Sequence, residues 1–248
     1  MFVLTAGNAS FATAETVHVA VAANFTAVMQ EIVTQFEQAT GHKAMVSFGS
    51  TGKLYAQIQH GAPFGLFLAA DAQHAERLER EGLVVADSRF TYAIGKLLLW
   101  SPDPDLIDAE GRVLSSDRVT RLAIANPKSA PYGTAAQQAL TQLGLWDAMQ
   151  GRLIQGDSIS QTYQYVASGN VPLGLIALAQ VALLPAASAG SQWLVPAALY
   201  APLRQQVVLL KSAQKNSAAQ ALHQWLQGEA ARTLILRYGY ALESQIAR

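Results

Sequence analysis

The chain has 248 residues, 51% of them hydrophobic and 14% charged, and 17 basic residues balance 17 acidic ones. This length and apolar content fit one or two domains with a sizeable core, while the scattered Lys and Arg argue against a nucleic-acid-binding surface. Because the chain has no cysteine, a disulfide framework, a thiol nucleophile and cysteine metal ligands are excluded.

The first 14 residues are typical of the end of an export signal. An apolar opening leads to Ala12-Thr13-Ala14, the small-x-small pattern of a signal-peptidase site. The basic segment that begins such a signal is missing, as it would be with a late start codon or a trimmed chain. We therefore predict a signal-peptide remnant over residues 1–14 and a mature chain from about Glu15. The alternative is a disordered, alanine-rich tail.

Strands and helices alternate through the first third of the chain. Val17, Val19 and Val21 alternate as in a strand, and apolar residues then recur at helical spacing from Val28 to Phe36. The same order repeats twice more, with strands at 44–48 and 64–71 and helices at 54–58 and 72–82. This β-α-β-α-β-α pattern predicts a parallel sheet with helices on both faces.

A second α/β unit follows. Strands are predicted in 92–102, 121–125 and at the start of 171–182, which continues into a helix, with further helices at 134–144 and 159–169. A strand at 205–213 and helical segments at 217–240, broken at Gly228, end the chain. Two α/β lobes predict a cleft between them, where ligands lie at the carboxyl ends of strands and at helix N-termini.

Four strand-to-helix turns carry small or neutral polar residues. One is Gly49-Ser50-Thr51-Gly52-Lys53, which is not a nucleotide phosphate loop because Ser47 and Leu54 stand where that motif needs Gly and Ser or Thr. The other three turns contain Asn24, Tyr132-Gly133 and Ser158-Ile159-Ser160. Taken alone, the turn at 49–53 is explained as an ordinary helix cap. Together the four turns predict an anion site built from neutral donors.

Other constellations are weaker. The five histidines lie far apart, and neither G-x-S-x-G nor H-E-x-x-H occurs. Helix capping accounts for Asp71 and Asp157, and "RYGY" (237–240) is interpreted as packing at a helix end. The residues therefore offer no base–nucleophile pair for an enzyme.

At these turns the chain resembles a known family, the periplasmic molybdate-binding proteins of ABC importers. The resemblance runs from about Val17 to Tyr240 and rests on "AANFTAVMQEIVTQFEQATG", "VSFGSTGKLYAQIQHGAPFGLFLAAD", "NPKSAPYGTAAQQALTQLGLWD", "NVPLG" and "RYGY". It implies an α/β, two-lobed periplasmic-binding-protein type II fold, each lobe a mainly parallel sheet flanked by helices, with the ligand in the interlobe cleft. Lobe I is expected at 15–94 and 198–248, and lobe II at 95–197.

The resemblance also implies a ligand and a set of site residues. The ligand is molybdate or tungstate, held by neutral donors with no direct metal ligand and no cofactor. Many members have a tyrosine just after "PLG", where this chain has Leu175, so the tyrosine is expected from the "APYG" turn instead. The implied ligand-binding residues are Ala23, Asn24, Ser50, Thr51, Tyr132 and Ile159.

The implied role is capture without catalysis. A periplasmic monomer would close on the anion, with the lobes joined near 93–96 and 194–204, and deliver it to a membrane permease. Alternatives are the same fold with sulfate, thiosulfate, a ferric ion or an organic anion, an enzyme acting on a phosphorylated substrate, and the effector-binding domain of a transcription regulator. Iron is disfavoured because Tyr132 is the only tyrosine expected in the cleft.

Overall fold

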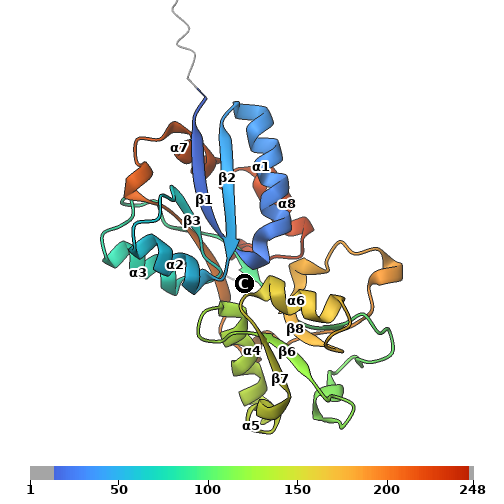
Figure 1. Ribbon diagram of the computed structural model, residues 1–248. Coiled ribbons are helices and arrows are strands. Elements are labelled where there is room, and N and C mark those ends of the chain that lie inside the picture. The colour runs from blue at the N-terminus through green and yellow to red at the C-terminus, as the bar shows by residue number, and fades with distance from the viewer. Residues whose placement is uncertain (1–13, 246–248) are drawn as a thin grey trace, which may run out of the picture.

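The computed structural model describes residues 14–245. They form two lobes, each a five-stranded sheet flanked by helices, with the four helix N-termini of the predicted turns gathered between them (Figure 1). The predicted signal-peptide remnant lies outside the described residues except for Ala14. Within the described part, no helix is long and apolar enough to cross a membrane.

The first lobe has the sheet order β2-β1-β3-β10-β4. Four of its strands run in one direction, and β10 is antiparallel to its neighbours β3 and β4. Its strands are β1 (Thr16–Ala22), β2 (Lys43–Gly49), β3 (Leu66–Leu68), β4 (Phe90–Gly95) and β10 (Leu203–Leu209). Its helices are α1 (Thr26–Thr40), α2 (Thr51–Gln59), α3 (Gln73–Arg80), α7 (Ser217–Trp225) and α8 (Glu229–Arg237).

The second lobe repeats this plan with the order β7-β6-β8-β5-β9. Again four strands share a direction, and β5 is antiparallel to β8 and β9. Its strands are β5 (Leu97–Ser101), β6 (Leu122–Ala125), β7 (Leu153–Gly156), β8 (Gly174–Ala177) and β9 (Ser191–Leu194). Its helices are α4 (Pro131–Gln142), α5 (Trp146–Met149) and α6 (Ile159–Ala167). The mainly parallel sheets of the two-lobed prediction are confirmed.

Apolar side chains alternate between the two faces of each sheet, so helices can cover both faces. On β1, Val19 and Val21 pack in the core under α1, α7 and α8, while Ala20 between them packs under α2 and α3. On β5, Leu97 and Leu99 face the α4 side, and Leu98 faces the α6 side. Successive residues of a strand point to opposite faces, so strands buried on both sides appear as continuous apolar runs.

Two passages connect the lobes. Lys96 alone separates β4 from β5, and residues 195–202 separate β9 from β10. The segment 92–102, predicted as one strand, is therefore two strands that belong to different sheets. The register of β10 against β4 shifts between Gln205 and Gln206, which leaves Tyr92 as an extra residue on β4.

Local structure differs from the prediction at one helix and two strands, and agrees with it at Gly228. The helix predicted after β8 is only a 3₁₀ turn, Leu178–Gln180. The short strands β7 and β9 were not predicted, because both are sheet edges with partly exposed residues and no long apolar run. The break at Gly228 is confirmed, since that residue separates α7 from α8.

Candidate anion-binding cleft

The N-terminal ends of α1, α2, α4 and α6 meet between the lobes (Figure 1). Residues at these ends line a small cavity. Its empty space is about 200 Å³, part of it open to solvent. None of the residues that line it is charged, and all six predicted site residues are among them. The lining consists of Ala22, Ala23, Asn24, Gly49, Ser50, Thr51, Ala70, Ala130, Pro131, Tyr132 and Ile159.

The second turn provides two hydroxyl groups. Ser50 caps α2 with extended backbone angles, yet its side chain makes no capping bond. Ser50 is 4% exposed, and its buried Oγ has no hydrogen-bond partner among the described residues. Thr51 Oγ1 accepts a hydrogen bond from the backbone N–H of Ala70 at 3.1 Å, which leaves its own hydroxyl hydrogen for another acceptor. Because a buried unpaired polar atom is costly, Ser50 Oγ indicates a missing partner in the cavity.

The first turn contributes backbone rather than side-chain donors. Asn24 Nδ2 donates to Gln205 Oε1 at 2.8 Å and to the Tyr240 hydroxyl at 2.9 Å, so both amide hydrogens are used within the protein. Ala23 and Asn24 begin the 3₁₀ turn Ala23–Phe25, which leads into α1. The first N–H groups of a helix lack an intrahelical partner, so these two backbone groups can bind an anion.

The second lobe contributes the third and fourth turns. Tyr132 lies in the first turn of α4, and its hydroxyl oxygen accepts a hydrogen bond from Gln205 Nε2 at 3.2 Å. Its hydroxyl hydrogen is therefore left to donate elsewhere. Ile159 is the first residue of α6, which Ser158 caps by accepting from Gln161 N–H at 3.3 Å. The backbone N–H of Ile159, like those of the first turn, has no partner within its helix.

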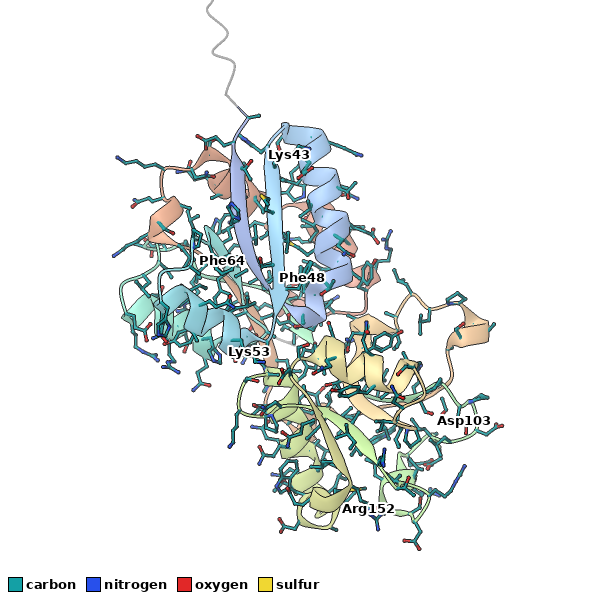
Figure 2. All side chains as sticks on the ribbon, viewed as in Figure 1. Lys43, Phe48, Lys53, Phe64, Asp103 and Arg152 are labelled. Carbon is teal, nitrogen blue, oxygen red and sulfur yellow. The ribbon has the colours of Figure 1, made fainter. Side chains whose placement is uncertain are left out.

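Contacts across the cleft hold the lobes together. Gly52 N–H donates to the Ser129 carbonyl at 2.9 Å, and Ser160 Oγ donates to the Ala23 carbonyl at 3.0 Å. Figure 2 shows Lys53 at the junction of the lobes. Its ammonium group forms an ion pair with Asp157 Oδ2 at 2.9 Å, and both side chains are largely exposed. The four turns are thus brought together in a closed arrangement.

Three residues behind the cavity were missed or misread from the sequence. Gln205 and Tyr92 were not singled out, and Tyr240 was interpreted as helix-end packing. Instead, the Tyr240 hydroxyl donates to the Asn24 carbonyl at 2.9 Å, and Tyr92 donates to Gln205 Oε1 at 3.0 Å. The signal that could have revealed Gln205 is a pair of amides, Gln205 and Gln206, directly before the apolar end of β10, since buried polar side chains need partners.

The electrostatics of the cleft come from neutral groups. Burial raises the pKa of Tyr132 and of Tyr92 well above the usual value of a phenol, and it also raises the pKa of Tyr240. The hydroxyl groups therefore stay protonated and able to donate at neutral pH. Among residues 14–245, no group of three or more His, Cys, Asp or Glu is arranged to hold a metal ion.

Anion affinity is expected to be independent of pH between about pH 6 and pH 9, because no group with a pKa in that range lines the cavity. The buried phenols have folded-state pKa values above their unfolded ones, so their stabilisation is complete below about pH 10 and is lost as pH rises through the raised values. Binding constants measured from about pH 6 to pH 9 test the first statement, and unfolding midpoints measured from about pH 9 upward test the second. A tenfold change in affinity within the window would reveal a titrating group at the site.

The chain is similar to known proteins in both sequence and structure. The family described as bacterial extracellular solute-binding protein matches residues 17–241. A molybdate-binding protein, ModA, of Azotobacter vinelandii is 53% identical over 94% of this chain and 92% of its own length. The ModA of Rhodobacter capsulatus is 45% identical over 97% of this chain and 94% of its own length.

A solved structure shares the fold closely. The periplasmic molybdate-binding protein of Azotobacter vinelandii superposes with a TM-score of 0.88 at 42% identity, covering 91% of this chain and 99% of that one. A coverage this large includes residues of both lobes.

Proposed function

The chain belongs to the bacterial extracellular solute-binding protein family, and on this premise we propose that it captures molybdate or tungstate for an ABC importer. The observation that carries the proposal is Ser50 Oγ, buried without a partner in a cavity lined only by uncharged residues. The names of the similar proteins from Azotobacter and Rhodobacter support the choice of molybdate.

The chemistry of the cavity matches a small tetrahedral dianion. The hydroxyl groups of Ser50, Thr51 and Tyr132, with the backbone N–H groups of the first and fourth turns, offer donors from four directions. Hydrogen bonds to a charged acceptor contribute about 1.5–3 kcal/mol each. Helix N-termini add the positive ends of their dipoles. Such donors hold a dianion without a cationic side chain.

Selectivity follows from donor placement. An anion that carries a proton, such as hydrogen phosphate, needs an acceptor, and a cavity of donors gives it none. Sulfate is a smaller tetrahedron and cannot reach all of the fixed donors at once. Each buried donor left unpaired costs about 1–3 kcal/mol, which is enough to separate anions of similar shape.

The proposed cycle is binding and release, without catalysis. The lobes open about the two passages, the anion binds, and closure restores the contacts between Gly52 and Ser129 and between Ser160 and Ala23. The closed monomer then docks in the periplasm on a membrane permease. The similarity to binding proteins favours this role over an enzyme acting on a phosphorylated substrate.

Calorimetric titration of the purified protein with molybdate, tungstate, sulfate and phosphate tests the proposal. We expect tight, one-to-one binding of the first two and affinities for the others lower by about 30-fold or more, equivalent to two donors left unpaired at about 1 kcal/mol each. Equal affinity for sulfate would contradict the proposed ligand. Failure of all four to bind would leave the fold and remove the oxyanion role.

A further inference from the structure

We propose that Gln205 is a positioning residue that directs the hydroxyl hydrogen of Tyr132 toward the bound anion. The inference rests on the proposed function and adds a residue that does not line the cavity. Gln205 lies on β10, next to the register shift against β4, and is fully buried. Its amide group makes one hydrogen bond to lobe II and the others to lobe I.

A backbone carbonyl fixes the direction of the hydrogen bonds that reach Gln205. The Asn24 carbonyl can only accept, so it takes the hydroxyl hydrogen of Tyr240 at 2.9 Å. The Tyr240 oxygen must then accept from Asn24 Nδ2, also at 2.9 Å. The second hydrogen of Asn24 Nδ2 donates to Gln205 Oε1 at 2.8 Å. The orientation of the Asn24 amide group therefore follows from a group that cannot reverse.

The order of hydrogen bonds set by the Asn24 carbonyl continues through Gln205 to the cavity. With Oε1 fixed as the acceptor of Asn24 and Tyr92, Gln205 presents Nε2 to the Tyr132 oxygen at 3.2 Å. A phenolic oxygen that accepts on one side keeps its hydrogen for the other side. Among the described residues that hydrogen has no protein acceptor, and Tyr132 lines the cavity. Hydrogen bonds in such a series also strengthen one another.

The contact between Gln205 and Tyr132 is packed closely against the backbone of Gly95. A Cβ atom added at Gly95 would lie 2.2 Å from the Tyr132 hydroxyl and 2.7 Å from Gln205 Nε2. Gly95 ends β4, directly before the first passage between the lobes. Because Gln205 belongs to the sheet of lobe I and Tyr132 to lobe II, their hydrogen bond joins the two lobes.

The titratable groups around Gln205 are phenols. They are Tyr92 from β4, Tyr132 from α4 and Tyr240 after α8, and burial raises the pKa of each. Asp71 and Tyr200 lie farther out, where they act on Tyr92 and Tyr132 respectively. An uncharged amide therefore fits these surroundings. A carboxylate in its place would be the one group near Tyr132 to change charge between about pH 6 and pH 9.

The Gln205→Glu variant tests the direction of the series. A carboxylate can only accept, so it would draw the Tyr132 hydrogen away from the anion, whereas the protonated carboxyl can again donate to Tyr132. We expect molybdate affinity to fall by about tenfold or more at pH 9 and to recover as pH falls toward about 6, because burial and the nearby dianion raise the pKa of a carboxyl. The wild-type protein should show no such dependence.

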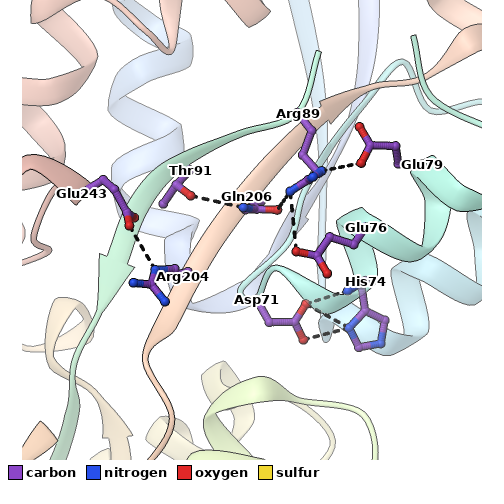
Figure 3. A network of polar contacts seen from close by, with 9 residues as sticks. All are labelled: Asp71, His74, Glu76, Glu79, Arg89, Thr91, Arg204, Gln206 and Glu243. Atoms are coloured by element: carbon purple, nitrogen blue, oxygen red, sulfur yellow. Dashed lines mark hydrogen bonds and ion pairs between the residues drawn. The ribbon is translucent and has the colours of Figure 1, made fainter. Parts of the chain in front are cut away.

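Neutral variants separate positioning from charge repulsion. Gln205→Leu should weaken binding about tenfold in the wild-type background but at most about twofold when Tyr132 is already phenylalanine. Gln206→Leu is the matched control, because Gln206 is also buried on β10 but bonds to Arg89 and Thr91 (Figure 3). It should lower stability and leave affinity unchanged.

The outcomes distinguish this inference from the proposed function. The inference would be overturned if Gln205→Glu kept the molybdate affinity of the wild type at every pH. It would also be overturned if the losses of affinity from Gln205→Leu and Tyr132→Phe were additive in the double mutant. Failure of the wild-type protein to bind molybdate or tungstate would overturn the proposed function instead. In that case the free energies of unfolding of the single and double variants without ligand decide whether Gln205 and Tyr132 are coupled. Additive changes in these free energies would also overturn the inference.

Discussion

Replacing Tyr132 with phenylalanine is expected to weaken molybdate binding by about 10- to 150-fold. The loss corresponds to one hydrogen bond to a charged acceptor, about 1.5–3 kcal/mol. Removing the oxygen also leaves Gln205 Nε2 without its acceptor, which penalises the closed arrangement specifically. The ring itself, 1% exposed within the core of lobe II, is retained, so the packing of α4 should not change.

Equilibrium titration of the wild-type and Tyr132→Phe proteins measures this effect, with thermal unfolding of the ligand-free proteins alongside. Tyr163→Phe is a suitable control, because Tyr163 lies on α6 against Trp100, with ring centroids 5.5 Å apart, and does not line the cavity. Its affinity should equal that of the wild type. An unchanged affinity in Tyr132→Phe, or a large loss of ligand-free stability, would make Tyr132 a packing residue.

The Ser50→Ala variant is expected to change affinity and stability in opposite directions. Affinity should fall by about 10- to 150-fold, because the hydroxyl loses its bond to the anion. Stability without ligand should stay the same or rise, since the change removes a buried polar atom that has no partner in the protein. Few other roles for a buried serine predict this pair of results, because a capping serine would instead lose about 1 kcal/mol of stability.

Ser129→Ala provides the matched control for Ser50. Ser129 Oγ is also buried without a partner, but Ser129 does not line the cavity, and it contacts the opposite lobe through its carbonyl. The substitution removes the same atoms and leaves that carbonyl in place, so affinity should be unchanged. If the two alanine variants lose affinity equally, the role proposed for the Ser50 hydroxyl group is wrong.

Local pattern was sufficient to predict most of the fold. The alternating valines of β1, the helical spacing from Val28 to Phe36 and the apolar run of β3 each report a period that burial imposes on the sequence. The four polar turns could be predicted too, because helix N-termini select small and polar residues. That these turns share one cavity came from the order of strands and helices, which brings carboxyl ends of parallel strands together.

Long-range contacts account for what was missed. Asn24 and Gln205 are 181 residues apart, and Asn24 and Tyr240 are 216 apart, so no local pattern connects them. The sequence placed Asn24 at the site but gave no sign that its amide hydrogens are used behind the cavity. The edge strands β7 and β9 were not predicted because their residues are partly exposed and form only a weak apolar pattern.

Diffraction at the molybdenum absorption edge, from crystals of the protein with bound molybdate, tests the central claim most directly. We predict a single anomalous peak between the four helix N-termini, with oxygen atoms of the anion within hydrogen-bonding distance of Ser50, Thr51 and Tyr132 and no Lys, Arg or His side chain in contact. A peak elsewhere on the molecule, or an anion held by a cationic side chain, would contradict a site of neutral donors.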